Sequence, residues 1–147
     1  MALDTNILVY MLDPAYPEHK YCNFITKLSE DFILCLNPTV VHEAYHTLVY
    51  GQKWVREDAR RKLEALIKHP YTKFFNQTKR ICMEALKIAE SYDLGGRDSL
   101  IIANYLLNGI EGMFTHDEEI KGIGEVRWRR GRIRFIDPVP AELEPQK

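Results

Sequence analysis

Cysteine is scarce in this chain of 147 residues, which has three cysteines at widely separated positions, Cys22, Cys35 and Cys82. An odd number of cysteines, without the close pairs of a metal-binding motif, argues against a disulfide framework and against a zinc framework. We therefore expect all three to be buried free thiols in a protein that works in a reducing compartment.

Long apolar runs are also missing. No stretch of about 18 apolar residues is present to cross a membrane. The first residues, Met1 to Asp4, show neither the basic nor the apolar region of a signal peptide. We expect a protein without membrane association that is located in the cytoplasm.

Neither sign of charge is in excess, because 20 lysines and arginines face 21 aspartates and glutamates, for a net charge of −1. The chain as a whole has no electrostatic attraction to nucleic acid, so any such site must be local. Hydrophobic residues make up 46% and charged residues 28%, a balance that excludes a disordered acidic or basic tail. The length predicts a single domain over residues 1–147.

The sequence does contain an alternation of short apolar runs and helical patterns. Residues 32–36 form a continuous apolar run closed by Asn37-Pro38, which is typical of a parallel strand buried on both faces. Shorter strand candidates end at Asp4, Thr115 and Ile136. Helical spacing is found over residues 17–28, 39–51 (with Thr39 as the expected N-cap), 55–67, 81–92 and 98–108. The alternation predicts an α/β sandwich in which a mostly parallel central sheet is flanked by helices.

Four acidic residues fall where strands end or where the following helices begin. Asp4 ends the first strand and Asp117 follows the strand candidate that ends at Thr115. Glu43 lies near the first turn of the helix after the second strand, and Asp98 opens a helix after two glycines and an arginine. In open α/β sheets the binding crevice lies outside the carboxyl ends of the strands, so these four side chains can converge there.

Each acid also has a plainer explanation. Taken alone, Asp98 is explained as well by an N-cap, or by an acid that the helix dipole favours, as by a site residue. Asp117 alone is typical of a turn, and Asp4 of a local Asx turn. Glu43 is harder to explain as a surface residue, because its neighbours at positions 40, 41, 44 and 48 are apolar. Four such coincidences in matching places favour a shared site.

Clustered carboxylates have a definite chemistry. Their repulsion raises their proton affinities and couples their titration, and Mg²⁺ or Mn²⁺, which prefer oxygen ligands, relieves it. A water activated by such an ion can attack a phosphodiester. The sequence has no zinc-type Cys–His spacing, no glycine-rich phosphate loop and no nucleophile elbow. We therefore predict a catalytic centre in which Asp4, Glu43, Asp98 and Asp117 bind Mg²⁺ or Mn²⁺.

The same residues carry a family resemblance. Four segments resemble, in order, the four motifs of the PIN-domain family: Asp4-Thr5-Asn6-Ile7-Leu8, Pro38-Thr39-Val40-Val41-His42-Glu43, Asp98-Ser99-Leu100-Ile101-Ile102-Ala103 and Thr115-His116-Asp117. The length and the closing Ile136-Asp137-Pro138 are similar to the VapC toxins of VapBC toxin–antitoxin pairs. The resemblance spans almost the whole chain.

This resemblance implies a PIN-like three-layer sandwich and a metal-dependent endoribonuclease. Asp4, Glu43 and Asp98 would then be metal ligands, directly or through water, and Asp117 would complete the acidic pocket. Asn6 and Thr115 would orient carboxylates or waters, although both are explained equally well as turn-forming side chains. His116 stands between two motif residues; a role as base or phosphate contact is conceivable, but a solvent-facing histidine is the simpler expectation.

A basic and aromatic segment precedes the final strand candidate. Arg127, Trp128, Arg129, Arg130 and Arg132 place four guanidinium groups and an indole within six residues. Arginine pairs with phosphate and tryptophan stacks on unpaired bases, so this segment is a candidate for contact with RNA or with a partner protein. The alternative is a solvated hairpin, or a sheet edge protected by charge.

The VapC resemblance also implies three partners: an RNA substrate, a second copy of the chain in a homodimer, and a small antitoxin. Apolar and aromatic bulk near one helix end forms either plain core or part of a partner groove, and it is supplied by Tyr45, Leu48, Val49, Tyr50 and Trp54.

Two other functions stay open. One is a PIN nuclease of RNA processing or decay that has no antitoxin, which a small neighbouring reading frame for an antitoxin would argue against. The other is a non-catalytic PIN-fold binding module, which the loss of an acid would indicate; all four acids are present.

Overall fold

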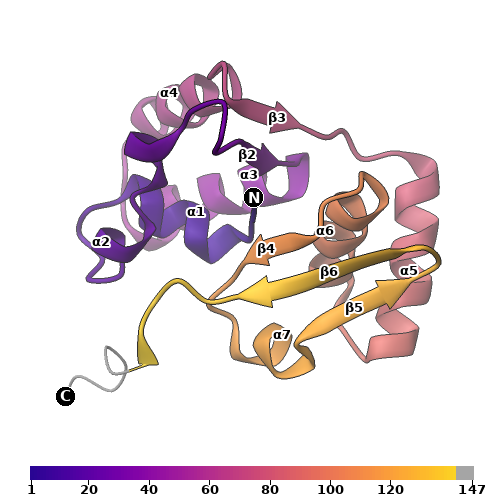
Figure 1. Cartoon of the computed structure of the whole chain (residues 1–147). Coiled ribbons are helices and arrows are strands. Elements are labelled where there is room, and N and C mark those ends of the chain that lie inside the picture. Colours follow the sequence, from indigo (N-terminus) through magenta and orange to yellow (C-terminus); the bar gives the residue numbers. More distant parts are fainter. Residues whose placement is uncertain (142–147) are drawn as a thin grey trace.

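The computed structural model describes residues 1–141, which contain one six-stranded sheet with the strand order β3-β2-β1-β4-β6-β5 (Figure 1). All neighbouring strands are parallel except β5, which runs antiparallel to β6 at the edge. The strands are β1 (Ala2–Leu3), β2 (Leu34–Leu36), β3 (Thr72–Phe74), β4 (Gly112–Phe114), β5 (Glu125–Trp128) and β6 (Gly131–Ile136).

Helices flank this sheet, and Figure 1 shows α5 and α6 behind β5 and β6. The helices are α1 (Thr5–Leu12), α2 (His19–Cys22), η1 (Phe24–Lys27), α3 (Pro38–His46), η2 (Thr47–Gly51), α4 (Arg56–Ile67), α5 (Lys79–Tyr92), α6 (Gly96–Leu107) and α7 (Glu118–Ile123). The predicted α/β class, with a mostly parallel sheet flanked by helices, is confirmed. Within residues 1–141, no helix combines the length and the apolar character that crossing a membrane requires.

Helix α3 begins differently from the expectation. Its N-cap is Asn37, whose side chain accepts a hydrogen bond from the backbone N–H of Val40, and Pro38 is the first helical residue. The prediction of Thr39 as N-cap was wrong because proline is favoured at the first position of a helix and forces the preceding residue into an extended conformation. As a result Glu43 lies in the second turn, two residues further from the start of the helix than expected.

The segment predicted as one helix over residues 17–28 is divided into α2 and the 3₁₀ helix η1. Cys22 and Phe24 are both buried, and two residues at that spacing cannot share one face of a continuous helix. The break at Asn23, which has non-helical backbone angles, lets both side chains enter the core.

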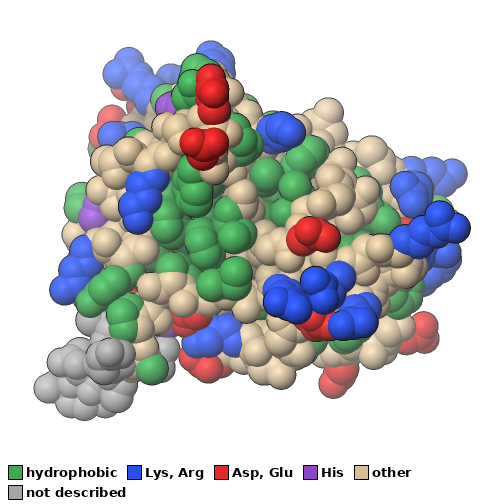
Figure 2. Space-filling view, viewed as in Figure 1, with side chains coloured by type: hydrophobic (Ala, Val, Ile, Leu, Met, Phe, Trp, Pro, Cys, Tyr) green, Lys and Arg blue, Asp and Glu red, His purple; other side chains and the backbone are tan. Residues whose placement is uncertain are grey.

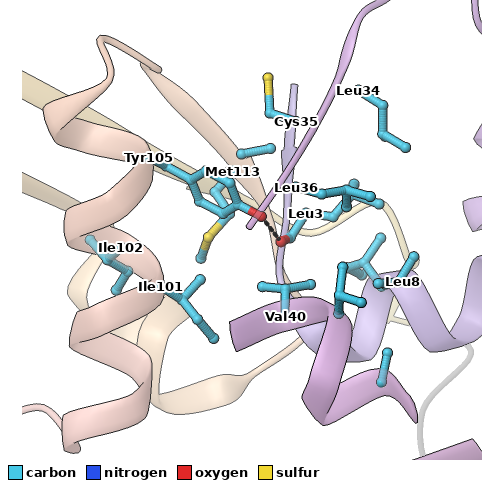
Figure 3. Packing of buried hydrophobic residues seen from close by; sticks show 14 of the residues in the cluster. Leu3, Leu8, Leu34, Cys35, Leu36, Val40, Ile101, Ile102, Tyr105 and Met113 are labelled. Carbon is cyan, nitrogen blue, oxygen red and sulfur yellow. Dashed lines mark hydrogen bonds between the residues drawn. The ribbon is translucent and has the colours of Figure 1, made fainter. Parts of the chain in front are cut away.

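A buried tyrosine fixes the carboxyl end of β1. Tyr105 of α6 is fully buried, and its hydroxyl donates a 2.7 Å hydrogen bond to the carbonyl oxygen of Leu3 (Figure 3). Met113 of β4 and Ile101 of α6 pack in the same core. This packing positions the residue that follows Leu3, which is Asp4.

Two of the three cysteines are buried free thiols, as expected, and the third is not. Cys22 and Cys35 are buried, whereas Cys82 is exposed on α5. The prediction was wrong for Cys82 because the core-facing side of α5 is formed by Ile81, Ala85 and Ile88, and position 82 lies off that stripe.

Candidate active site

All four predicted acids line a single cleft of about 280 Å³ at the carboxyl ends of β1 and β4, which we call the acidic cleft. They come from four separate segments: the β1–α1 junction, α3, the first turn of α6 and the β4–α7 connection. The lining residues are Asp4, Thr5, Asn6, Val9, Tyr10, Tyr16, Glu43, Thr47, Asp98 and Asp117.

Asp4 is the most buried of these acids, with 5% of its surface exposed. Burial raises the pKa of its carboxyl from 3.8 to about 6, against the lowering effect of two hydrogen bonds, and the charges of Asp98 and Asp117 raise the pKa further. One oxygen accepts from the backbone N–H of Thr5 at 2.7 Å, so Asp4 is also the N-cap of α1. Asp4 therefore caps a helix and lines the acidic cleft at the same time.

Thr115 connects two of the acids. Its fully buried hydroxyl donates a 2.6 Å hydrogen bond to Asp4 Oδ2 and accepts one from the backbone N–H of Asp117 at 3.1 Å. The side chain of Asp117 caps α7 by accepting from the N–H of Ile120 at 3.0 Å. Thr115 thus ties the β1–α1 junction to the segment that carries Asp117.

Glu43 is held by two residues that the sequence reasoning did not single out. The Thr5 hydroxyl donates to Glu43 Oε1 at 2.7 Å, and Arg97 Nη1 lies 2.9 Å from Glu43 Oε2. Thr5 stands inside the Asp4-Thr5-Asn6 motif, so its position offered a signal. Arg97 directly precedes Asp98 in the sequence, but nothing in that spacing indicates a contact with α3.

Asp98 lies in the first turn of α6 but does not cap it, because Gly95 is the N-cap and contributes no side-chain bond. Burial raises the pKa of Asp98, and the charges of Asp117, Glu43 and Glu119 raise it further. Glu119 is an additional acid near the cleft that the motif comparison missed. Burial is the larger cause of these shifts, and the further rise comes from repulsion between the carboxylates across the cleft.

Asn6 and His116 contact each other through the backbone. Asn6 Oδ1 accepts from the N–H of His116 at 3.4 Å, which links α1 to the segment before Asp117. The His116 ring nitrogen Nδ1 lies 2.8 Å from Asp137 Oδ2, and its side chain is 14% exposed. The expectation of a solvent-facing histidine was wrong, because Asp137 and the ring of Tyr10 cover this side chain.

The donor set of the cleft fits a hydrated hard cation. Within residues 1–141, no three His, Cys, Asp or Glu side chains converge closely enough to bind one ion directly. Asp4 and Glu43 instead direct both carboxylate oxygens to protein donors. The charged ligands that line the cleft are carboxylates, and Mg²⁺ needs only one or two of these because it retains several waters. The residues therefore suit Mg²⁺ or Mn²⁺ bound partly through water.

The basic segment does not join this site. Arg127, Trp128, Arg129, Arg130 and Arg132 surround the turn between β5 and β6, which lies at the amino end of β6. Because β6 is parallel to β4, this turn lies at the amino ends of these strands, whereas the acidic cleft lies at the carboxyl ends of β1 and β4. Figure 1 shows the turn beside α5. Contact of this segment with RNA or a partner stays a prediction.

Similar proteins agree with this fold. A model of the PIN domain matches residues 1–126 of the chain. Ribonuclease VapC6 of Methanocaldococcus jannaschii is 27% identical over 141 residues, which cover 82% of this chain and 90% of that protein.

Solved structures with a similar fold include VapC20 of Mycobacterium tuberculosis, described as a toxin that cleaves the sarcin–ricin loop. It has a TM-score of 0.70 and 14% identity and covers 87% of this chain and 98% of its own. A toxin–antitoxin complex from Klebsiella pneumoniae has a TM-score of 0.64 and 15% identity, and the match covers 93% of this chain and 96% of the chain in that complex. VapBC2 of Rickettsia felis, bound to a DNA fragment from its promoter, has a TM-score of 0.60 and 18% identity, and the match covers 82% of this chain and 90% of the chain in that structure. With the acidic motifs in order and the family model matching most of its length, this chain belongs to the PIN-domain family.

Proposed function

We propose that this chain is a divalent-metal-dependent endoribonuclease of the VapC kind, which hydrolyses RNA phosphodiester bonds in the acidic cleft. One observation carries the proposal: four carboxylates from four separate chain segments line one small cleft, and Asp98 and Asp117 raise the pKa of Asp4. A fold does not gather like charges at a cost in repulsion for stability alone. The family match and the similarity to a VapC ribonuclease support the same chemistry.

In this proposal Asp4, Glu43, Asp98 and Asp117 hold Mg²⁺ or Mn²⁺, directly or through water. The bound ion would supply an activated water and would neutralise charge that develops on the phosphate. Thr115 fixes the direction of the Asp4 carboxylate and Thr5 fixes that of Glu43, so both acids are oriented before substrate arrives. Asn6 keeps the backbone beside Asp117 in place through its bond to His116.

The test is cleavage of labelled RNA by the purified protein. RNA fragments should form in Mg²⁺ or Mn²⁺ and should not form after EDTA is added. Cleavage that persists in EDTA, or its absence from a panel of structured and single-stranded RNAs in both metals, would contradict the proposal.

We further propose that the chain works as the toxin of a toxin–antitoxin pair, as a homodimer that a small antitoxin protein inhibits. Two of the solved structures with a similar fold are a toxin–antitoxin complex and a VapBC pair bound to DNA. We also propose a cytoplasmic location, because an enzyme that cuts cellular RNA must work where that RNA is.

A further inference from the structure

A second concavity, of about 540 Å³, adjoins the acidic cleft. It shares Thr5, Glu43 and Thr47 with the cleft, so the two hollows are continuous. Four further residues line this second hollow but not the acidic cleft: Thr39, His42, His46 and Arg97. We call it the histidine groove.

Its floor follows from the spacing of α3. Thr39, His42 and His46 recur at intervals of three and four residues, which places them on one helical face, and both histidines are exposed. The His46 ring lies 4.8 Å from the ring of Tyr50, measured between centroids. Tyr50 is 51% exposed, and its hydroxyl accepts a 3.0 Å hydrogen bond from Arg56. His46 thus lines the groove, and the exposed ring of Tyr50 lies against the His46 ring beside it.

Arg97 of α6 lines the groove beside Glu43, which borders both hollows. Its side chain is 80% exposed and pairs with Glu43 Oε2 at 2.9 Å. Exposed ion pairs contribute little stability, so Arg97 can exchange this carboxylate for a phosphate. Among the described residues that line the groove, Glu43 is the one carboxylate, which leaves the groove far less negative than the acidic cleft.

We propose that the histidine groove binds the nucleotide adjacent to the scissile bond, with Arg97 contacting its phosphate and the His46–Tyr50 pair stacking on its base. This inference rests on the ribonuclease function proposed above. Guanidinium groups bind phosphate oxygens through paired hydrogen bonds, and unpaired RNA bases stack on histidine and tyrosine rings. Stacking requires a base that is free of its neighbours, so the groove selects a single-stranded or looped segment.

The phosphate contact is tested by fluorescence anisotropy with a labelled single-stranded RNA in EDTA, where no cleavage occurs. Arg97→Gln should weaken binding about threefold to tenfold and should reduce the salt dependence by about 0.7 in the slope of log K against log salt. Arg61→Gln is the matched control, because Arg61 is an exposed arginine of α4 that pairs with Glu57 and lines neither hollow. Equal affinity and equal slope for wild type and Arg97→Gln would overturn the phosphate contact.

The stacking contact is tested by kinetics in Mg²⁺ with RNAs that differ at one nucleotide beside the cleavage site. His46→Ala combined with Tyr50→Ala should raise KM severalfold, change kcat less, and reduce the preference among the bases at that position. A melting scan of the double variant shows that it is folded. An unchanged KM together with an unchanged base preference in a folded double variant would overturn the stacking.

Failure of the groove and failure of the ribonuclease proposal give different results. If the wild type cuts RNA and the Arg97 and His46–Tyr50 variants behave like it, the groove is refuted while the nuclease stands. If RNA binding depends on Arg97 and no RNA is cut in either metal, the nuclease is refuted and the groove remains a strand-binding site.

Discussion

The acids of the cleft are oriented by hydroxyl groups that stand one or two residues away from another acid. Thr5 follows Asp4 but donates to Glu43, and Thr115 precedes Asp117 by two residues but donates to Asp4. Each threonine thereby couples the acid of its own segment to the acid of another. A change at either hydroxyl should disturb two carboxylates together.

Asp98 offers the sharpest substitution because no capping bond depends on its side chain. Asp98→Asn should keep the fold and lower the RNA cleavage rate at least about a hundredfold, since a neutral amide binds a hard cation poorly. Asp58→Asn makes the same chemical change at an exposed acid in the first turn of α4 and should cleave like the wild type. Wild-type cleavage by a folded Asp98→Asn variant would remove Asp98 from the site.

The same substitution should stabilise the protein when metal is absent. Removing one of the repelling charges should raise the melting temperature in EDTA by a few degrees, at about 3 °C per kcal/mol for a chain of this size. Added Mn²⁺ should raise the melting temperature of the wild type by mass action and that of the variant less. A lower melting temperature for Asp98→Asn in EDTA would show instead that this acid has a structural partner.

A buried acid of α5, Glu84, helps to fasten the β5–β6 hairpin to that helix, together with the Tyr92 hydroxyl that bonds to the backbone of Arg127. Glu84 accepts hydrogen bonds from Arg129 and from Trp128 Nε1, the latter at 3.1 Å. Arg129 has a φ of 56° at the turn, a left-handed conformation that residues other than glycine adopt rarely. Two residues of the segment predicted to contact RNA or a partner thus hold the edge of the sheet in place.

This attachment should depend on pH. The hydrogen bonds from Arg129 and Trp128 lower the pKa of Glu84 from 4.5 to about 2. A carboxyl whose pKa is lowered in the folded state adds stability above its unfolded pKa, and this stability is lost as the pH falls from about 4.5 towards 2. Glu84→Gln should therefore be less stable than the wild type near neutral pH, and the difference should shrink near pH 3.

Urea unfolding of both proteins at the two pH values measures this difference. Glu90→Gln, at an exposed position of the same helix, is the control and should match the wild type at both. A deficit for Glu84→Gln that is the same at both pH values would contradict the pKa argument.

The elements that could be predicted from sequence were those with a strong apolar period. Strand β2 follows from a continuous apolar run and α6 from a dense apolar helix. Strand β3 carried no such signal, because it lies at the sheet edge and none of its residues is fully buried. Helix α7 is six residues long and buries one side chain, Ile120, too little for a period to be seen.

The candidate site was predicted better than its supporting contacts. The four acids were found because carboxyl ends of parallel strands meet at one edge of a sheet. The partners Thr5 and Arg97 were missed because their bonds to Glu43 join segments far apart in the sequence. Neither periodicity nor local spacing carries information on such contacts.

The net charge of −1 conceals two opposite poles. The acidic cleft lies at one edge of the sheet, and the β5–β6 strand pair carries a group of basic side chains that Figure 2 shows on the face toward the viewer. Arg127 and Arg132 stand opposite each other in the register of these strands. Glu125, which pairs with Arg127 at 2.5 Å, neutralises only part of this charge.

The assembly state follows from the toxin proposal. Light scattering should give twice the chain mass of 17.2 kDa, and the product of an adjacent small gene should co-purify and suppress RNA cleavage. Co-expression with a frameshifted copy of that gene is the control. A monomeric protein whose gene has no such neighbour would contradict the toxin proposal but not the ribonuclease proposal.

The bond between Thr115 and Asp4 joins positions 111 residues apart, and this has a consequence for the protein's own synthesis. At translation rates of 5 to 20 residues per second, Thr115 is made roughly 6 to 22 seconds after Asp4. During that interval the nascent chain has no β4 to pair with β1 and no Asp117. The acidic cleft is therefore incomplete until most of the chain has been translated, and a message broken before that point yields a fragment that lacks the complete cleft.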